Sequence, residues 1–150
     1  MTGRIIPDVV NNQTIQTLSP KNTVRDAAQL MGTRRISAIL ISEEDGKLLG
    51  IVTERDLTAK VLAASMDPDT TALAEIMTKD PHVIGPEGSP LDALELMRVR
   101  GFRHLPVVDN EQVVGMVSIR DLYAAAKDQL EEDVRQREAF IFDTGYGAGA

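Results

Sequence analysis

Gly50-Ile51-Val52-Thr53-Glu54-Arg55-Asp56-Leu57 recurs 65 residues later as Gly115-Met116-Val117-Ser118-Ile119-Arg120-Asp121-Leu122, with five of the eight positions identical. Upstream of this stretch, a shift of 66 residues aligns Leu30-Met31 with Leu96-Met97. The one-residue difference falls in the polar segment between two apolar runs, where a hairpin turn tolerates a change of length. The chain is therefore an internal duplication, and this decides how its fold is interpreted.

Each copy has the pattern of a strand, a helix, a two-stranded hairpin and a second helix. Thr23 and Ser89 are the expected N-caps of the first helices, and Pro90 occupies the first helical position of the second copy. Two short apolar runs then indicate a hairpin buried on both faces. The expected strands are residues 14–18, 38–41 and 48–52 in the first copy and residues 82–84, 105–108 and 113–117 in the second.

The two copies are expected to pack together, because one copy has too few elements to bury both faces of its hairpin. The expected fold class is α/β (α+β), with two β-α-β-β-α repeats packed through their sheets as one pseudo-twofold module. The expected segments are repeat 1 (13–62), a connector (63–79), repeat 2 (80–127) and a C-terminal helix with a flexible tail (128–150).

The last helix is expected to continue through an apolar stripe of Leu122, Ala126, Leu130 and Val134, flanked by charges, as far as Phe140. Two interpretations are open: a solvated helix folded back on the domain, or a helix for self-association. The stripe and the apolar helix faces of the repeats predict a homodimer. Residues 145–150 are expected to be a frayed tail.

The composition excludes several classes of protein. The 150 residues include 16 basic and 23 acidic side chains, a net charge of −7, which argues against nucleic-acid binding and against a basic membrane-surface protein. Hydrophobic residues make up 43% of the chain, which is enough for a core. Cysteine is absent, and neither a signal peptide nor a membrane-spanning run is expected. A cytoplasmic location is expected.

The residues that enzymes use are poorly represented. His82 and His104 are the only histidines, and neither lies at a spacing typical of a metal site. No Walker A motif is present, and the glycine-rich tail lacks the following helix that a dinucleotide site requires. A protein without catalytic activity, metal or cofactor is expected.

The two copies of the Gly-apolar-Val-[Thr/Ser]-x-Arg-Asp-Leu ending, together with Arg103-His104-Leu105-Pro106-Val107-Val108-Asp109, resemble the cystathionine-β-synthase (CBS) domain family. The resemblance covers residues 13–127, and the chain is similar to small standalone bacterial CBS-pair proteins. It implies two clefts related by pseudo-twofold symmetry, a module that dimerises, and an adenine-containing ligand such as AMP, ADP, ATP, S-adenosylmethionine or NAD. It also implies a non-catalytic sensor that passes ligand occupancy to an unidentified target protein.

The resemblance assigns ribose and phosphate contacts to the [Thr/Ser]-x-x-Asp element, which is Thr53 with Asp56 in the first copy and Ser118 with Asp121 in the second. A carboxylate offers paired acceptors for two vicinal hydroxyls. The same pairs also fit capping boxes at the start of a helix. For either copy taken alone, both interpretations stay open.

The resemblance places the residues before Leu-Pro-Val at the phosphate end of a cleft, and these are Arg103 and His104. An Arg fork binds phosphate bidentately, and a His titrates near neutral pH. A packed, satisfied His104 is the alternative. Arg55 and Arg120 are further phosphate candidates, although arginines in a first helical turn are often solvated, and Thr78 matches a family position near the base.

The two clefts are expected to be unequal. The tight site is expected to contain Ser118, Asp121, Arg103 and His104, and a weak or empty one to contain Thr53 and Asp56. The expected function is a regulatory sensor that binds an adenine nucleotide of the AMP, ADP or ATP class. The alternative is a structural or adaptor dimer with vestigial clefts.

Overall fold

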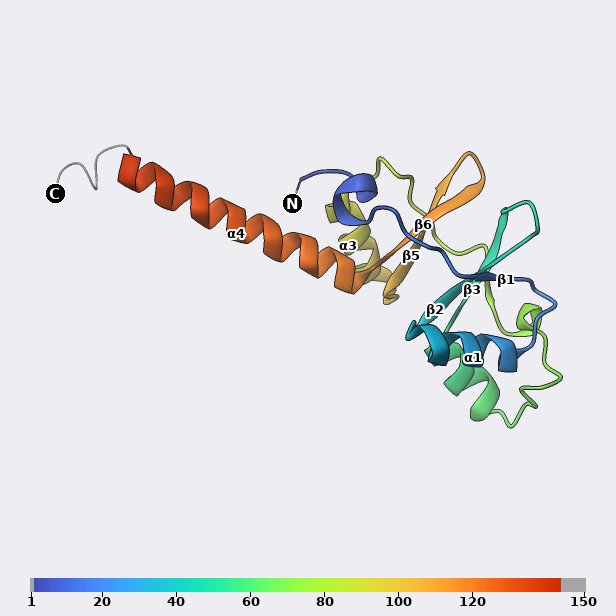
Figure 1. Cartoon of the computed structure of the whole chain (residues 1–150). Coiled ribbons are helices and arrows are strands. Elements are labelled where there is room, and N and C mark those ends of the chain that lie inside the picture. The colour runs from blue at the N-terminus through green and yellow to red at the C-terminus, as the bar shows by residue number, and fades with distance from the viewer. Residues whose placement is uncertain (1, 144–150) are drawn as a thin grey trace.

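The computed structural model describes residues 2–143, and the two copies of the repeat form neighbouring lobes (Figure 1). The first copy consists of β1 (Thr17–Leu18), α1 (Val24–Arg34), β2 (Ala38–Ser42), β3 (Leu48–Thr53), α2 (Glu54–Asp56) and η2 (Leu57–Leu62). The connector contains η3 (Leu73–Glu75) and β4 (Thr78–Lys79). The second copy consists of α3 (Pro90–Arg100), β5 (His104–Asp109), β6 (Gln112–Ser118) and α4 (Ile119–Asp143). The mixed α+β fold predicted from the sequence is confirmed.

The predicted helix starts are confirmed at both copies. Thr23 caps α1 through a capping box, because its side chain accepts from the N–H of Asp26 while the Asp26 carboxylate accepts from the N–H of Thr23. Ser89 caps α3, and Pro90 is its first residue. Both helices end at a residue in the left-handed region, Arg35 for α1 and Gly101 for α3.

The strands form one larger and one smaller sheet. The first sheet has the order β1-β2-β3-β4, with β1 parallel to β2 and the other pairs antiparallel. The second sheet contains β5 and β6, and its expected first strand is reduced to a single parallel bridge between Ile84 and Val107. Val114 of β6 is 39% exposed, so the second hairpin is not buried on both faces as expected. A bridge between Lys47 and Gln112 joins the turns of the two hairpins.

The apolar core is divided into three clusters, and the alternation of side chains along β2 shows how they are connected. Ile39 and Ile41 face the cluster under α1, whereas Ala38 and Leu40 face a middle cluster on the other side of the sheet. Val113 and Met116 of the second copy pack against this middle cluster. The repeats of one chain therefore pack on each other through their sheets, with separate cores on either side.

The N-terminal segment η1 (Ile5–Val9) completes the core of the second repeat, although it precedes the first in sequence. Ile5 is fully buried in the cluster that contains Leu105 and Leu122. Its N–H donates to the carbonyl of Gly88 at 3.0 Å. The repeat pattern contained no signal for this contact, because η1 has no counterpart in the other copy.

The helix α4 is 25 residues long and projects from the second lobe (Figure 1). Leu122 is fully buried in the second core, but Leu130 and Val134 are 64% and 53% exposed. The predicted continuous stripe is therefore wrong for Leu122, and the folded-back interpretation does not describe α4. The expected frayed tail at residues 145–150 lies outside the described residues. Among residues 2–143, none of the helices combines the length and the apolar character needed to cross a membrane.

Candidate functional site

A cavity of about 680 Å³ lies where the two lobes meet. Three short stretches supply most of its lining: the end of β3 with α2, the segment from β4 onwards, and the loop before β5. The lining residues are Ser37, Ile51, Thr53, Glu54, Arg55, Asp56, Thr78, Asp80, Pro81, His82, Gly101, Phe102, Arg103 and His104. Six residues predicted from the sequence as binding residues are therefore brought together in one cavity.

Thr53 and Asp56 form a complete capping box at the start of α2. Asp56 Oδ2 accepts from the N–H of Thr53 at 2.9 Å and from its hydroxyl at 3.2 Å, and Thr53 Oγ1 accepts from the N–H of Asp56 at 3.3 Å. Asp56 Oδ1 lies 3.1 Å from the Lys60 ammonium. The box fixes the direction of the Asp56 side chain, and a ribose hydroxyl would meet a carboxylate that is already oriented.

Ser118 and Asp121 form the equivalent contacts at the start of α4. Asp121 Oδ2 accepts from the N–H of Ser118 at 2.8 Å and from its hydroxyl at 2.9 Å, while the N–H of Asp121 donates to Ser118 Oγ at 3.1 Å. These contacts confirm the capping interpretation in both copies. They leave the ligand interpretation untested, because a carboxylate oxygen can accept further hydrogen bonds.

His104 lies at the junction between the lobes. Its Nε2 is 3.1 Å from the hydroxyl of Ser37, the residue just before β2 in the first copy. The carbonyl of Ser37 accepts from the N–H of Glu54, and the carbonyl of Arg103 accepts from the N–H of Ile119. The starts of β2 and β5 therefore lie close together, each beside the first residue of a following helix.

This junction changes the expected grouping of residues. Arg103 and His104 line the cavity with Thr53 and Asp56, which was the pair expected at the weaker cleft. Ser118, Arg120 and Asp121 are not among the residues that line this cavity. The cause is the contact between Ser37 and His104, which turns the segment before β5 toward the first lobe. The expected site containing both Asp121 and Arg103 is corrected accordingly.

Thr78 is positioned by β4, which pairs with β3 through Ile51 opposite Thr78. The corresponding edge of the second sheet is occupied differently. The Gln13 side-chain amide accepts from the N–H of Met116 at 3.0 Å and donates to its carbonyl at 2.8 Å. Asn12, the counterpart of Thr78 in the sequence, has φ 52°. The two copies therefore differ where the family resemblance places the base.

Sequence analysis did not single out several lining residues. His82 and Phe102 form a stacked pair with ring centroids 5.7 Å apart and planes inclined by 23°. Both rings belong to residues that line the cavity, as does Asp80. Phe102 is one of only five aromatic residues and directly precedes Arg103, which is the signal that would have identified it.

Burial lowers the pKa of His104 below its ordinary value of 6.5, and Arg103 lowers it further, while Asp121 and Glu54 act in the opposite direction. His104 is thus neutral in the folded state over a pH range in which the unfolded chain already binds a proton. Its contribution to stability is complete above about pH 6.5 and declines as the pH falls through the interval below it. Neutral His104 suits a hydrogen bond with Ser37.

We expect His104→Gln to weaken the pH dependence of stability between pH 7 and pH 5, because it removes the group that must be kept deprotonated. The measurement is the free energy of unfolding by denaturant at each pH, for the wild type, His104→Gln and the control His82→Gln. The wild type should lose stability relative to His104→Gln as the pH falls. Parallel curves for these two proteins would contradict the lowered pKa.

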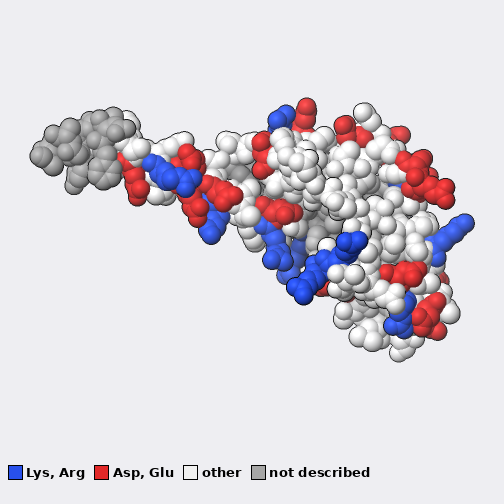
Figure 2. Space-filling model, in the orientation of Figure 1, with Lys and Arg blue, Asp and Glu red and all other residues white. Residues whose placement is uncertain are grey.

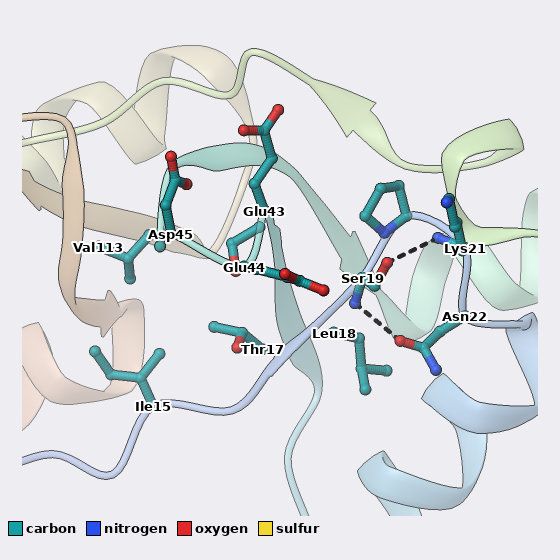
Figure 3. Close-up of a pocket in the computed structure, with 13 residues that line it drawn as sticks. Ile15, Thr17, Leu18, Ser19, Lys21, Asn22, Glu43, Glu44, Asp45 and Val113 are labelled. Carbon is teal, nitrogen blue, oxygen red and sulfur yellow. Dashed lines mark hydrogen bonds between the residues drawn. The ribbon is translucent and has the colours of Figure 1, made fainter.

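A second cavity, of about 810 Å³, lies beside the β2–β3 turn and contains none of the predicted binding residues. Figure 3 shows the carboxylates of Glu43, Glu44 and Asp45 together with the apolar side chains of Ile15 and Val113. No group of three or more metal-ligating side chains is found in residues 2–143. This cavity therefore adds no identifiable chemistry to the first.

Comparison with known proteins gives the same answer for both halves of the chain. The CBS domain family matches residues 5–63 and 73–128. The CBS domain-containing protein CBSCBSPB2 of Arabidopsis thaliana is 32% identical over 136 residues, which are 89% of this chain and 25% of that protein. The chain thus spans about a quarter of the length of the first curated relatives that it matches.

Solved structures share the fold. A protein with CBS domains from Burkholderia ambifaria MC40-6 has a TM-score of 0.76 and 32% identity, over 82% of this chain and 93% of that one. CBSX2 in complex with AMP has a TM-score of 0.73 over 85% of this chain and 98% of that one, and at 22% identity it shows the fold alone. The duplicated sequence, the two lobes and the family match over both of them show that this chain belongs to the CBS domain family, as a tandem pair of CBS domains.

Proposed function

We propose that this chain is a regulatory module that binds an adenine nucleotide in the cavity between its two CBS domains. CBS-domain-only proteins are generally non-catalytic regulatory modules, and some CBS pairs bind nucleotides. We further propose that occupancy of the cavity is passed to a target protein through a shift between conformations of the pair. In this proposal the chain also self-associates.

The observation that supports this proposal is the convergence of one acidic and two basic elements in a single cavity. Asp56 offers acceptors to vicinal ribose hydroxyls, while Arg55 and Arg103 offer guanidinium groups to a phosphate. His104 adds a donor or acceptor between the lobes. The volume of about 680 Å³ lies within the roughly 300–1,000 Å³ typical of small-molecule sites.

The charges around the cavity favour a nucleotide with few phosphates. Glu54, Asp56 and Asp80 carry negative charge against the two arginines, so each added phosphate meets more repulsion. We therefore expect AMP to bind more tightly than ADP, and ADP more tightly than ATP.

The alternative is an adaptor whose cavity holds no ligand. It is favoured by the completeness of the two capping boxes, because Thr53, Asp56, Ser118 and Asp121 all have structural partners without a nucleotide. The two functions differ in whether nucleotide binding is measurable at all, and in which aspartate it requires.

Asp56→Asn is expected to weaken AMP binding at least tenfold, whereas the matched Asp121→Asn should leave it unchanged. Both variants keep an oxygen that can cap a helix, but only Asp56 lines the cavity. Arg103→Gln should also cost at least tenfold, since a hydrogen bond to a charged group contributes about 1.5–3 kcal/mol and about 1.4 kcal/mol corresponds to a factor of ten.

The measurement is isothermal titration calorimetry with AMP, ADP and ATP, with thermal unfolding as a check that each variant is folded. A wild type that binds none of the three nucleotides would overturn the proposal and favour the adaptor. Equal losses in Asp56→Asn and Asp121→Asn would contradict the assignment of the site to this cavity.

A further inference from the structure

The projecting helix α4 exposes a line of apolar side chains. Tyr123, Leu130, Val134 and Ile141 are 59%, 64%, 53% and 45% exposed. Their separations of seven, four and seven residues are close to whole numbers of helical turns, so all four lie on one side of α4. Leu122, which packs in the core, lies about a quarter of a turn away from this line. The line is therefore distinct from the face that holds α4 on the body.

The C-terminal half of α4 extends beyond the body of the protein (Figure 1). An isolated helix shorter than roughly 12–15 residues is marginal in water, because most helical stability comes from packing of an apolar face. Hydroxyl Oγ1 of Thr2 donates to Gln129 at 3.3 Å, which places a contact with the body just before Leu130. The exposed line begins beside the body and continues along the projecting half.

We propose that this line, Tyr123, Leu130, Val134 and Ile141, packs against the same line on a second copy of the chain, with the two α4 helices antiparallel. The spacing of seven, four and seven residues is the same in either direction along the helix. An antiparallel copy therefore presents an apolar residue at every level: Tyr123 meets Ile141 of the partner subunit, and Leu130 meets Val134 of the partner subunit. This symmetry favours a second copy over an unrelated partner, because a twofold interface uses the same patch on both subunits.

The charges beside the line agree with this pairing. Lys127 and Glu138 lie on the same side of the line, about 40° and 60° from it at roughly 100° per residue. A twofold axis across the helices brings equal sides together, so Lys127 lies level with Glu138 of the partner subunit at both ends of the contact. In a parallel pair these residues would be 11 positions apart, or roughly 16 Å along the axis. Lys127 is free to exchange its exposed contact with Glu131, which is 3.8 Å long.

The charge of α4 also disfavours a lipid surface as the occupant. Asp128, Glu131, Glu132 and Asp133 lie in the middle of the helix, and Figure 2 shows acidic and basic side chains interspersed along it. Amphipathic helices that bind membranes are typically rich in Lys and Arg on the polar face. A second copy of α4 needs no such excess of positive charge.

The first test is the molar mass in solution, by sedimentation equilibrium over a range of concentrations. The wild type should form a dimer, and Leu130→Glu should weaken it at least tenfold. The matched control is Leu62→Glu, which places the same charge at a leucine that is 77% exposed on η2 and should leave the dimer intact. A monomeric wild type at about 100 μM, or a dimer that withstands Leu130→Glu, would overturn the proposal.

The second test addresses direction and register. Lys127→Glu should weaken the dimer, and Lys127→Glu combined with Glu138→Lys should restore it. Because the chain contains no cysteine, a mixture of Tyr123→Cys and Ile141→Cys proteins should form the mixed disulfide on mild oxidation. Disulfides only between identical variants would indicate a parallel pair and overturn the antiparallel arrangement.

Nucleotide binding provides an independent readout, because α4 contributes no residue to the lining of the cavity. Leu130→Glu should bind AMP like the wild type if the proposed function holds. A wild type that binds no nucleotide but dimerises through α4 would overturn the proposed function and support this inference. Binding of the monomer to vesicles of anionic phospholipid, without dimerisation, would overturn it in favour of a lipid surface.

Discussion

Ile5→Ala is expected to lower the free energy of unfolding by about 2–5 kcal/mol, the range for truncating a large buried aliphatic side chain to alanine. Ile5 is fully buried, and the core that it enters belongs to the second repeat. Its N–H and that of Ile6 also donate to the carbonyls of Gly88 and Pro86. The loss combines reduced burial with a cavity beside Leu105 that neighbouring residues fill only partly.

Denaturant unfolding of Ile5→Ala and of the control Leu62→Ala would measure this effect. Leu62 is 77% exposed, so its truncation should change stability by less than about 0.5 kcal/mol. An Ile5→Ala effect as small as that of the control would mean that the N-terminal segment is not part of the second core.

Gly50→Ala is expected to destabilise the protein by about 1–3 kcal/mol and to disturb the cavity, because no space exists for a methyl group. A Cβ at Gly50 would lie 2.7 Å from the backbone oxygen of Thr78 and 2.8 Å from Met77 Sδ. The contact with Thr78 is a contact with backbone, so β4 would have to move away from β3. Thr78 lines the cavity, and its displacement should weaken AMP binding as well.

The repeat supplies a matched control for this substitution. At Gly115, the counterpart of Gly50, a Cβ would come nearest to the end of the flexible Gln13 side chain, at 2.9 Å, so Gly115→Ala should cost less. A Cβ at Gly32 in α1 would have no atom within 4 Å, and Gly32→Ala should stabilise by roughly 0.5–1 kcal/mol. Melting curves that place Gly50→Ala level with Gly115→Ala would contradict the proposed cause.

Local patterns were sufficient to predict the helix starts and the repeat. Thr23 and Ser89 cap their helices as expected, since a cap depends on residues within three positions of each other. The pairing of Ile84 with Val107 repeats that of Leu18 with Ile41 at the same shift of 66 residues. The duplication in sequence is thus a duplication in strand pairing.

Contacts between distant segments could not be predicted in the same way. The addition of β4 to the first sheet, and the amide of Gln13 in the equivalent place on β6, involve partners 27 and 103 residues apart. Ile51 and Met116 are equivalent in sequence, but one pairs with a strand and the other with a side chain. The segments that approach them differ, and periodicity within the repeat does not encode that difference.

The sequence by itself determined the family, the two-repeat architecture and the residue types suited to a nucleotide, because helix caps, strand periods and side-chain chemistry are properties of neighbouring residues. Only the tertiary structure decided that Arg103 and His104 share a cavity with Thr53 and Asp56 rather than with Asp121. The reason is that the composition of a cavity between two lobes depends on how the lobes are oriented. That orientation is set by the packing of Ala38 and Leu40 against Val113 and Met116, and by the contact of Ser37 with His104.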